Sequence, residues 1–212
     1  MGADRPKQYL ALGSRSLLER SVACLLADAR VARVLVVVGR DDPHAAQLAL
    51  PERCELLAAG GATRALTVQA GLAALAAQAD ADAWVLVHDA ARPCLNARDL
   101  AALIDQGVDE HGALLAVPVS DTVKRGQDGR VTQTVERTGL WRALTPQFFS
   151  VAVLARALAH CAGGAQITDE SSAVERLGLR PRLVAGAASN IKITAPGDLQ
   201  LAEAMLRSEG LW

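Results

Sequence analysis

Six short runs of Val, Leu, Ile and Ala that lack in-and-out alternation constrain the fold of this chain most strongly. Strands buried on both faces have this pattern, whereas strands with one solvent-facing side alternate apolar and polar residues. The runs lie at Arg33–Val38, Cys54–Ala58, Trp84–His88, Ala113–Val119, Arg182–Val184 and Asn190–Thr194. We therefore predict a mostly parallel sheet that is covered on both faces.

The segments between these runs have the apolar spacing of helices. Helical faces are formed by Leu17, Leu18, Val22, Leu25 and Leu26, by Leu72 and Leu75 within Thr63–Gln78, by Leu100, Leu103 and Ile104, and by Val153, Leu154 and Leu158. A last helix is expected from Pro196, a favourable first-turn residue, to about Arg207. Strands that alternate with helices over 212 residues predict one doubly wound α/β domain covering residues 1–212.

Residues 120–138 depart from this alternation of strands and helices, and their pattern predicts a projecting arm. Ser120–Arg125 and Arg130–Arg137 flank Gly126–Gly129, in which the Asp-Gly pair is a typical hairpin turn. The flanking residues alternate polar and apolar and are too polar for a core. Because an isolated hairpin is only marginally stable, we expect this β-hairpin arm to dock on a partner subunit of a homodimer.

Charge and composition exclude several classes of protein. The 22 Lys+Arg balance 23 Asp+Glu and only 3% of residues are aromatic, so no nucleic-acid partner is expected. No apolar run approaches the roughly 18 residues of a membrane span, and the first ten residues lack an apolar signal core. The four cysteines lack metal-ligand spacing, which favours reduced thiols in a cytoplasmic protein. The motifs of zinc proteases, serine hydrolases, P-loop NTPases and dinucleotide enzymes are absent from the sequence.

The clearest candidate site follows the strand predicted at Trp84–His88. In an open parallel sheet, ligands bind beyond the carboxyl ends of the strands, and here the chain delivers His88, Asp89 and Arg92. A carboxylate at this point suits Mg²⁺, which also binds substrate phosphates. The alternative interpretation is structural: Asp89 caps a helix and Arg92 forms a surface ion pair.

A second candidate site is the glycine pair Gly60-Gly61, which lies between a predicted strand and a predicted helix. Paired glycines let backbone amides approach a ligand closely, and a helix N-terminus favours an anion or an acceptor-rich base. A plain tight turn is the alternative.

Four further residues are candidates on weaker patterns. Lys7 follows a rigid proline and carries a mobile charge suited to a phosphate, although a solvated lysine near a frayed terminus has the same pattern. Lys192 lies within an apolar frame and either extends to solvent or faces the ligand end of the sheet. Thr122 and Arg137 lie on the two legs of the predicted arm, where solubilising surface residues are the alternative.

Taken in order, these motifs resemble one family. The chain carries eight motifs in this order: PKQYL, GG-x-x-R, VHDAARP, D-T-V-K, R-x-G-L-W, A-L-T-P-Q-F-F, I-T-D-E-S-S-A-V-E and N-I-K-I-T. As a set they resemble the 2-C-methyl-D-erythritol 4-phosphate cytidylyltransferases of the non-mevalonate isoprenoid pathway, from Pro6 to the last helix. PKQYL or VHDAARP alone would indicate only the broader glycosyltransferase-like nucleotidyltransferases, whose doubly wound fold the resemblance implies.

The resemblance implies that a phosphate oxygen of methylerythritol phosphate attacks the α-phosphorus of CTP, with Mg²⁺, giving CDP-methylerythritol and pyrophosphate. It implies that Lys7 stabilises the transition state, that Asp89 binds the metal and the nucleotide, and that Arg137 and Lys192 position the substrate phosphate. The remaining implied residues are Gly61, Ala62 and Thr67 for the nucleotide, and Arg92, Thr122 and Thr145 for the substrate. In the family the arm swaps across a homodimer, so Thr122 and Arg137 are expected to serve the neighbour's site.

This chain departs from the family pattern in two places. The family opens with a strand and a loop of the form A-A-G-x-G-x-R-M-G around the triphosphate, and this sequence begins at the last two residues of that loop. The chain as written is therefore expected to lack a central strand and most triphosphate contacts, and to turn over weakly or not at all. Ser189 stands where the family commonly has Asp, so weaker metal affinity is expected.

The sequence leaves two other functions open. A related polyol-phosphate cytidylyltransferase, of the ribitol phosphate type, would share the nucleotide half and differ in the arm and around Arg137 and Lys192. A non-catalytic nucleotide-binding homologue is suggested by the absent loop and by Ser189.

Overall fold

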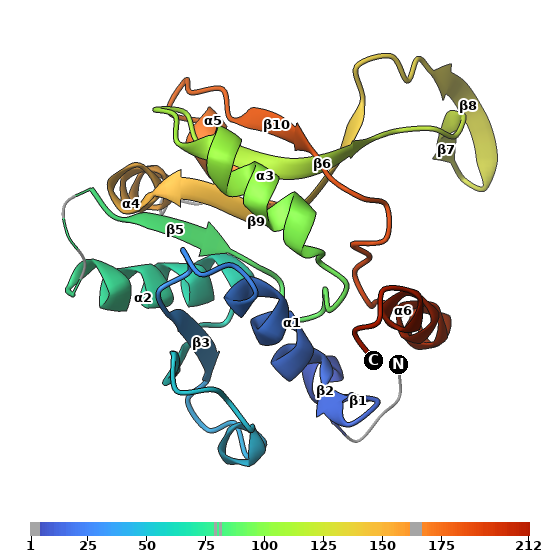
Figure 1. The fold of residues 1–212 in the computed structure, drawn as a ribbon. Helices are drawn as coiled ribbons and strands as arrows, with labels where there is room; N and C mark the ends of the chain where they lie inside the picture. Colours follow the sequence, from blue (N-terminus) through green and yellow to red (C-terminus); the bar gives the residue numbers. More distant parts are fainter. Residues whose placement is uncertain (1–4, 79, 81, 162–166) are drawn as a thin grey trace.

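The computed structural model of this chain describes residues 5–78, 80, 82–161 and 167–212 (Figure 1). The strands are β1 (Ala11–Leu12), β2 (Arg15–Ser16), β3 (Val34–Gly39), β4 (Cys54–Gly60), β5 (Trp84–Val87), β6 (Ala113–Pro118), β7 (Val123–Gln127), β8 (Arg130–Val135), β9 (Trp141–Ser150) and β10 (Arg182–Ala185). The helices are η1 (Lys7–Tyr9), α1 (Leu17–Leu26), η2 (Ala45–Gln47), α2 (Arg64–Ala76), α3 (Ala97–Gly107), α4 (Val151–His160), α5 (Glu170–Glu175) and α6 (Pro196–Ser208).

The central sheet has the strand order β10-β6-β9-β5. Strand β10 pairs in parallel with β6, whereas β9 runs antiparallel to both of its neighbours. Strands β3 and β4 form a separate parallel pair. No backbone pairing joins β3 to β5 in the described part of the chain. The predicted α/β class is confirmed, with β9 as an antiparallel strand inside the sheet.

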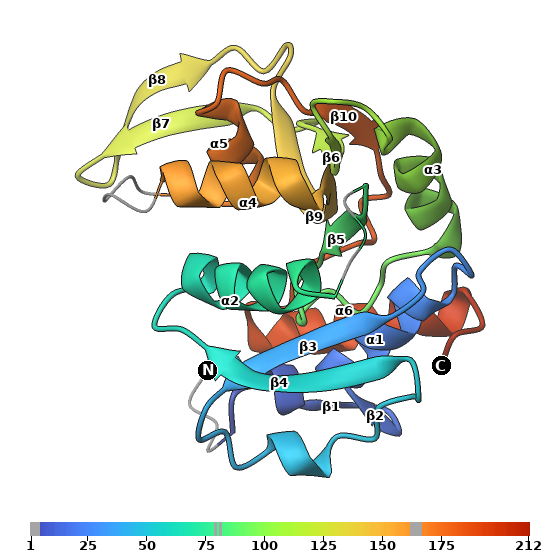
Figure 2. The same cartoon turned by 90° about the vertical axis from the view of Figure 1, so that its left-hand side faces the viewer.

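Helices cover both faces of this sheet, as predicted (Figure 2). Neighbouring residues of a strand point to opposite faces, and Phe148 and Phe149 of β9 show the consequence. Phe148 packs in one cluster with Leu103 of α3, while Phe149 packs in another with Leu72 of α2 and Leu154 of α4. Burying each phenyl ring contributes about 1.5–3 kcal/mol, so β9 ties the two helical layers together.

Two parts of the strand prediction need correction. Asn190–Thr194 forms no strand. Its buried residues instead contact the loop after β5, where the Ile193 N–H donates to the carbonyl of Ala91 at 2.8 Å. Strand β9 was not predicted, because Pro146 argues against a strand interior and the buried half of β9 does not alternate with polar residues.

The predicted hairpin is confirmed by the antiparallel pairing of β7 with β8. Asp128 and Gly129 both have positive φ, 51° and 75°, as tight hairpin turns of the primed types require. Nearly all residues of both strands are exposed. In both views the arm projects at the end of the molecule opposite to the β3–β4 pair (Figures 1 and 2).

The predicted free thiols are confirmed, since all four cysteines are unpaired. Within the described ranges, we find no helix with both the length and the apolar character that crossing a membrane requires.

Candidate functional site

A pocket with a volume of about 300 Å³ lies where β3, β4 and the loop after β5 meet η1 and the segment before α6. It is lined by Lys7, Gln8, Leu18, Val37, Val38, Gly39, Asp42, Gly60, Gly61, Thr67, Asp89, Ala90, Ala91 and Lys192. Five residues selected from the sequence are therefore brought to one place although they lie up to 185 positions apart: Lys7, Gly61, Thr67, Asp89 and Lys192.

The carboxylate of Asp89 lies among three cationic side chains. Its Oδ2 is 2.9 Å from Nζ of Lys192 and its Oδ1 is 3.0 Å from Nε of Arg64. Nε of Arg92 lies 3.7 Å from Oδ2. Burial by itself raises the pKa of Asp89, but the charges of Arg64 and Lys192 outweigh it and lower this pKa to about 2. Asp89 is therefore ionised throughout the physiological range.

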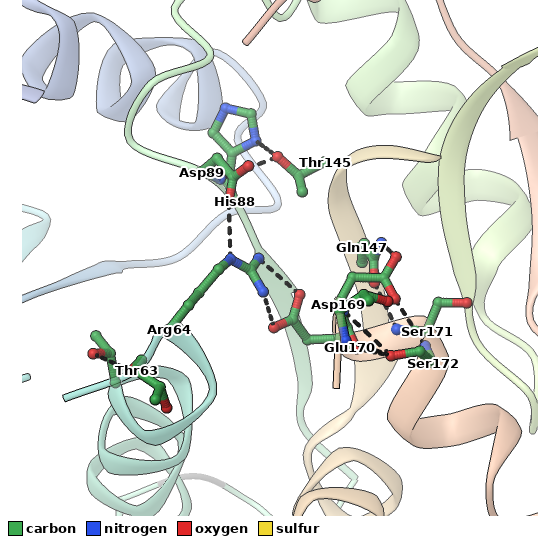
Figure 3. Close-up of polar contacts among 12 residues, drawn as sticks. Thr63, Arg64, His88, Asp89, Thr145, Gln147, Asp169, Glu170, Ser171 and Ser172 are labelled. Carbon is green, nitrogen blue, oxygen red and sulfur yellow. Dashed lines mark hydrogen bonds and ion pairs between the residues drawn. The ribbon is translucent and has the colours of Figure 1, made fainter. Parts of the chain in front are cut away.

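A chain of hydrogen bonds holds the backbone of this loop (Figure 3). The Asp89 N–H donates to Oγ1 of Thr145 at 3.0 Å, and that oxygen lies 3.0 Å from Nδ1 of His88. Nε2 of His88 lies 3.1 Å from the carbonyl of Arg92. Burial lowers the pKa of His88 to about 4, so the ring is neutral. We assign the proton to Nε2, because the Thr145 hydroxyl can then donate to Nδ1.

Thr145 was expected to bind substrate, yet it is buried and does not line the pocket. Its hydroxyl instead supports the backbone of Asp89. Of the structural alternative for Asp89 and Arg92, the helix cap is wrong, whereas Arg92 does form an ion pair, although a buried one, with Asp89. Helix α3 is capped by Asn96, and Arg92 is only 8% exposed, with Nη1 donating to the carbonyl of Asn190 at 2.6 Å.

The glycine segment at the end of β4 requires a residue without a side chain. A Cβ at Gly61 would lie 2.5 Å from Cβ of Leu66. The Gly61 N–H donates to Oγ1 of Thr67 at 3.1 Å, and the Thr67 hydroxyl donates to the carbonyl of Thr63 at 3.0 Å. Ala62 is exposed and is not among the lining residues. Gly61 and Thr67 thus present a defined backbone edge to the pocket.

The two lysines reach the pocket from opposite ends of the sequence. Nζ of Lys7 donates to the carbonyl of Ile193 at 3.3 Å, and the nearby Tyr9 is buried, so the segment that carries Lys7 is packed on the protein. The Lys192 side chain is 39% exposed and pairs with Asp89. Both ammonium groups can reach a phosphate that enters from solvent.

Two predicted residues are not brought to this pocket by their own chain. Thr122 and Arg137 are exposed at the base of the arm, and neither lines the pocket. Arg137 donates from Nη1 to the carbonyl of Ser120, on the opposite leg. Within one chain the arm residues and the pocket residues form separate groups.

Sequence reasoning missed three side chains that shape the site. Arg64 forms a bidentate ion pair with Glu170 of α5, 106 positions away. Asp42, which lines the pocket, accepts a hydrogen bond from the Tyr9 hydroxyl at 2.7 Å. Arg64 lies inside the GG-x-x-R motif and Glu170 inside the T-D-E-S-S motif, so the motifs were the sequence signal that could have pointed to these two residues. Their pairing, however, depends on tertiary structure.

The described residues contain no group of three or more His, Cys, Asp or Glu side chains that could hold a metal ion. Asp42 and Asp89 are the carboxylates that line the pocket, and Mg²⁺ in proteins is commonly bound by one or two carboxylates together with substrate phosphates. The donor set therefore fits a Mg²⁺ ion that arrives with a polyphosphate.

Comparison with known proteins identifies the family. The profile of 2-C-methyl-D-erythritol 4-phosphate cytidylyltransferase matches residues 1–208. Relatives of that name from Laribacter hongkongensis and Haemophilus influenzae are 55% and 47% identical over 97% and 96% of this chain, and 90% and 89% of their own length is covered.

Comparison with solved structures identifies the same family. A 4-diphosphocytidyl-2C-methyl-D-erythritol synthase has a TM-score of 0.88 at 43% identity, with 94% of each chain covered. The 2-C-methyl-D-erythritol 4-phosphate cytidylyltransferase of Thermus thermophilus has a TM-score of 0.81 at 33% identity, covering 95% of this chain and 94% of that one. With its pocket, its fold and its sequence in agreement, the chain belongs to the 2-C-methyl-D-erythritol 4-phosphate cytidylyltransferase family.

Proposed function

We propose that this protein transfers CMP from CTP to 2-C-methyl-D-erythritol 4-phosphate, releasing pyrophosphate. The observation that carries the proposal is the convergence of Lys7, Asp89 and Lys192 on one pocket that also contains the Gly61 edge. The membership of the family supports the same reaction, and we infer a cytoplasmic location from the reduced thiols.

The chemistry brings two anions together, so positioning and charge neutralisation dominate the catalysis. In our proposal, Lys7 stabilises negative charge at the α-phosphate, and Lys192 holds the attacking phosphate. Gly61 and Thr67 lie where the backbone can read the edge of a cytosine. Asp89 would hold Mg²⁺ together with the triphosphate, and the ion would supply further neutralisation of phosphate charge.

Metal affinity tests the expectation attached to Ser189. Ser189 occupies a turn three residues before Lys192 and has a neutral hydroxyl, which binds Mg²⁺ weakly. Ser189→Asp should therefore lower the Mg²⁺ concentration that gives half the maximal rate. The measurement is a magnesium titration of pyrophosphate release, with Ser189→Asn as the uncharged control. An unchanged titration in the Asp variant would contradict the expectation that Ser189 weakens metal binding.

We also propose a homodimer in which the arm supplies Thr122 and Arg137 to the neighbour's pocket. Two observations support it. The arm is exposed along nearly its whole length in one chain, and Arg137 does not line the pocket of its own chain. A two-stranded hairpin of this kind needs packing partners to be stable.

A substrate panel tests the proposed reaction. Pyrophosphate release is measured with CTP and either methylerythritol phosphate or ribitol phosphate. We expect turnover with the first substrate, whereas faster release with ribitol phosphate would favour the related polyol-phosphate enzymes. CTP binding without release from either substrate would instead favour a non-catalytic homologue.

The same assay tests the expectation of weak turnover. The chain as written is compared with a form extended at its N-terminus by about 20 residues, enough for one strand of about 5–6 residues and a loop. We expect the extended form to be faster, because an added strand could pair between β3 and β5 and bring its loop to the triphosphate. Equal rates would refute this expectation.

A further inference from the structure

Glu170 is a buried carboxylate that is paired with a single arginine. It is 1% exposed, and its Oε1 and Oε2 accept hydrogen bonds from Nη1 and Nη2 of Arg64 at 2.6 Å and 2.9 Å. Two parallel bonds of this kind fix both the position and the plane of a guanidinium group. The remaining edge of Arg64 directs Nε to Oδ1 of Asp89 at 3.0 Å (Figure 3).

One residue of the central sheet holds both neighbours of Glu170, the side chain of Asp169 and the backbone of Ser171. Nε2 of Gln147 donates to Oδ2 of Asp169 at 2.8 Å, and Oε1 of Gln147 accepts the Ser171 N–H at 2.7 Å. Gln147 belongs to β9 and is 1% exposed. The sheet therefore fixes the residues on either side of Glu170.

We propose that Glu170 is a positioning residue of this pocket, which acts through Arg64 on the carboxylate of Asp89. Arg64 holds Oδ1 of Asp89 and Lys192 holds Oδ2, so cations on opposite oxygens define the plane of the carboxylate. Glu170 itself does not line the pocket. The inference rests on the proposed function, because it assigns Asp89 a part in turnover.

A purely stabilising role would not explain this arrangement well. A buried ion pair contributes little net stability, because the loss of hydration offsets most of the attraction. If Glu170 acted only through its charge, removing that charge would have a different effect from the loss of a positioning contact. Glu170 is one of three carboxylates, with Asp42 and Asp89, set against the cations Lys7, Arg64 and Lys192. Removing its charge therefore makes the pocket more positive and attracts an anionic nucleotide at least as strongly.

The test is Glu170→Gln, which keeps the shape of the side chain and removes its charge. Kinetics are measured in whichever of the two forms compared above turns over faster. We expect kcat per folded molecule to fall by about 10–100-fold, the range of losses for residues that orient a ligand-binding group, with no rise in KM for CTP. Glu175→Gln is the matched control, since Glu175 lies on the same helix and pairs with Ser171. We expect its kcat to stay within about twofold of the parent value.

Two results would overturn the proposal. One is a lower Tm with unchanged kcat, which would make Glu170 purely structural. The other is a changed KM with unchanged kcat, which would make it a source of charge only. A double variant adds a check on the route: in an Arg64→Met background, Glu170→Gln should lower kcat no further. If the fold losses in kcat of the two single variants multiply in the double variant, Glu170 does not act through Arg64.

A readout without turnover separates this proposal from the proposed function. The Nε–H of a held arginine exchanges slowly with water and is observed by ¹⁵N NMR. We expect one such resonance, assigned by its loss in Arg64→Lys, to broaden or vanish in Glu170→Gln and to persist in Glu175→Gln. Its persistence in Glu170→Gln would overturn the positioning contact, whatever reaction the protein catalyses.

Discussion

At the scale of single residues, charge is the property that defines this pocket. Lys7 and Lys192 face it together, and Asp89 is the carboxylate that Arg64 and Lys192 hold ionised. Because the proposed reaction joins two phosphates, each cation should act on the rate more than on folding.

Lys7→Met tests this directly. Nζ of Lys7 makes one hydrogen bond to a backbone carbonyl, so its loss should change Tm little. We expect kcat for pyrophosphate release to fall by about 10²-fold or more, as for other donors that stabilise developing charge. Arg5→Met removes a nearby cation that lies outside the pocket lining, and it is the control. Equal losses in the two variants would argue against a specific role for Lys7.

The buried imidazole of His88 predicts a pH dependence of folding stability. Its pKa is about 4 in the folded protein, below the ordinary 6.5, so the unfolded chain binds more protons between these values. Stability should therefore be complete above about pH 7 and fall as the pH drops toward 4, by about 2 kcal/mol at pH 5. Urea unfolding at pH 7.5 and pH 5 measures this, and His88→Gln should lose that part of the slope.

At the scale of elements, the helices and most strands begin and end close to where the residue pattern predicts. Helix α2 starts one residue after the predicted Thr63, because the Thr63 hydroxyl caps it by accepting the Leu66 N–H. The failures have physical causes. Strand β9 contains Pro146, and in Asn190–Thr194 the apolar Ile193 is buried within a loop.

Two glycines with positive φ lie where elements are joined, and replacing each by alanine tests what that junction requires. Gly112, before β6, has a φ of 71°, and a Cβ there would lie 2.2 Å from Cδ1 of the buried Phe149. Gly129, in the arm turn, has a φ of 75° with no atom within 4 Å of such a Cβ. Gly129→Ala should cost about 1 kcal/mol of unfolding free energy, from backbone strain alone. Gly112→Ala should cost about 3 kcal/mol, because overpacking is added.

Urea unfolding of both variants gives the comparison. The difference between them isolates the close approach of the Phe149 ring and of the Phe148 carbonyl, since the two φ values are alike. Equal costs would mean that the phenyl ring moves aside without penalty.

At the scale of the whole molecule, the proposed homodimer predicts how many subunits a complete site needs. A swapped arm makes a specific prediction for mixtures of two inactive variants, Arg137→Ala in the arm and Lys192→Ala in the pocket. In a mixed dimer, one site would combine an intact pocket with an intact arm from the neighbour. Random mixing should restore about a quarter of the parent activity, because half of the dimers are mixed and each has one intact site.

Co-refolding the two variants and measuring pyrophosphate release gives the result. No recovery in mixtures that contain dimers would mean that each arm serves the site of its own chain. The separately refolded variants, mixed without exchange, are the control.

The sequence by itself determined the α/β class, the helices, the hairpin arm and the identities of the candidate residues. Those follow from local periodicity, turn chemistry and motif order, which need no knowledge of the rest of the chain. Tertiary structure alone decided that Glu170 pairs with Arg64, that Thr145 supports the loop instead of lining the pocket, and that β9 runs inside the sheet. The physical reason is that a contact between residues 106 positions apart arises from the packing of whole elements, to which no local pattern refers.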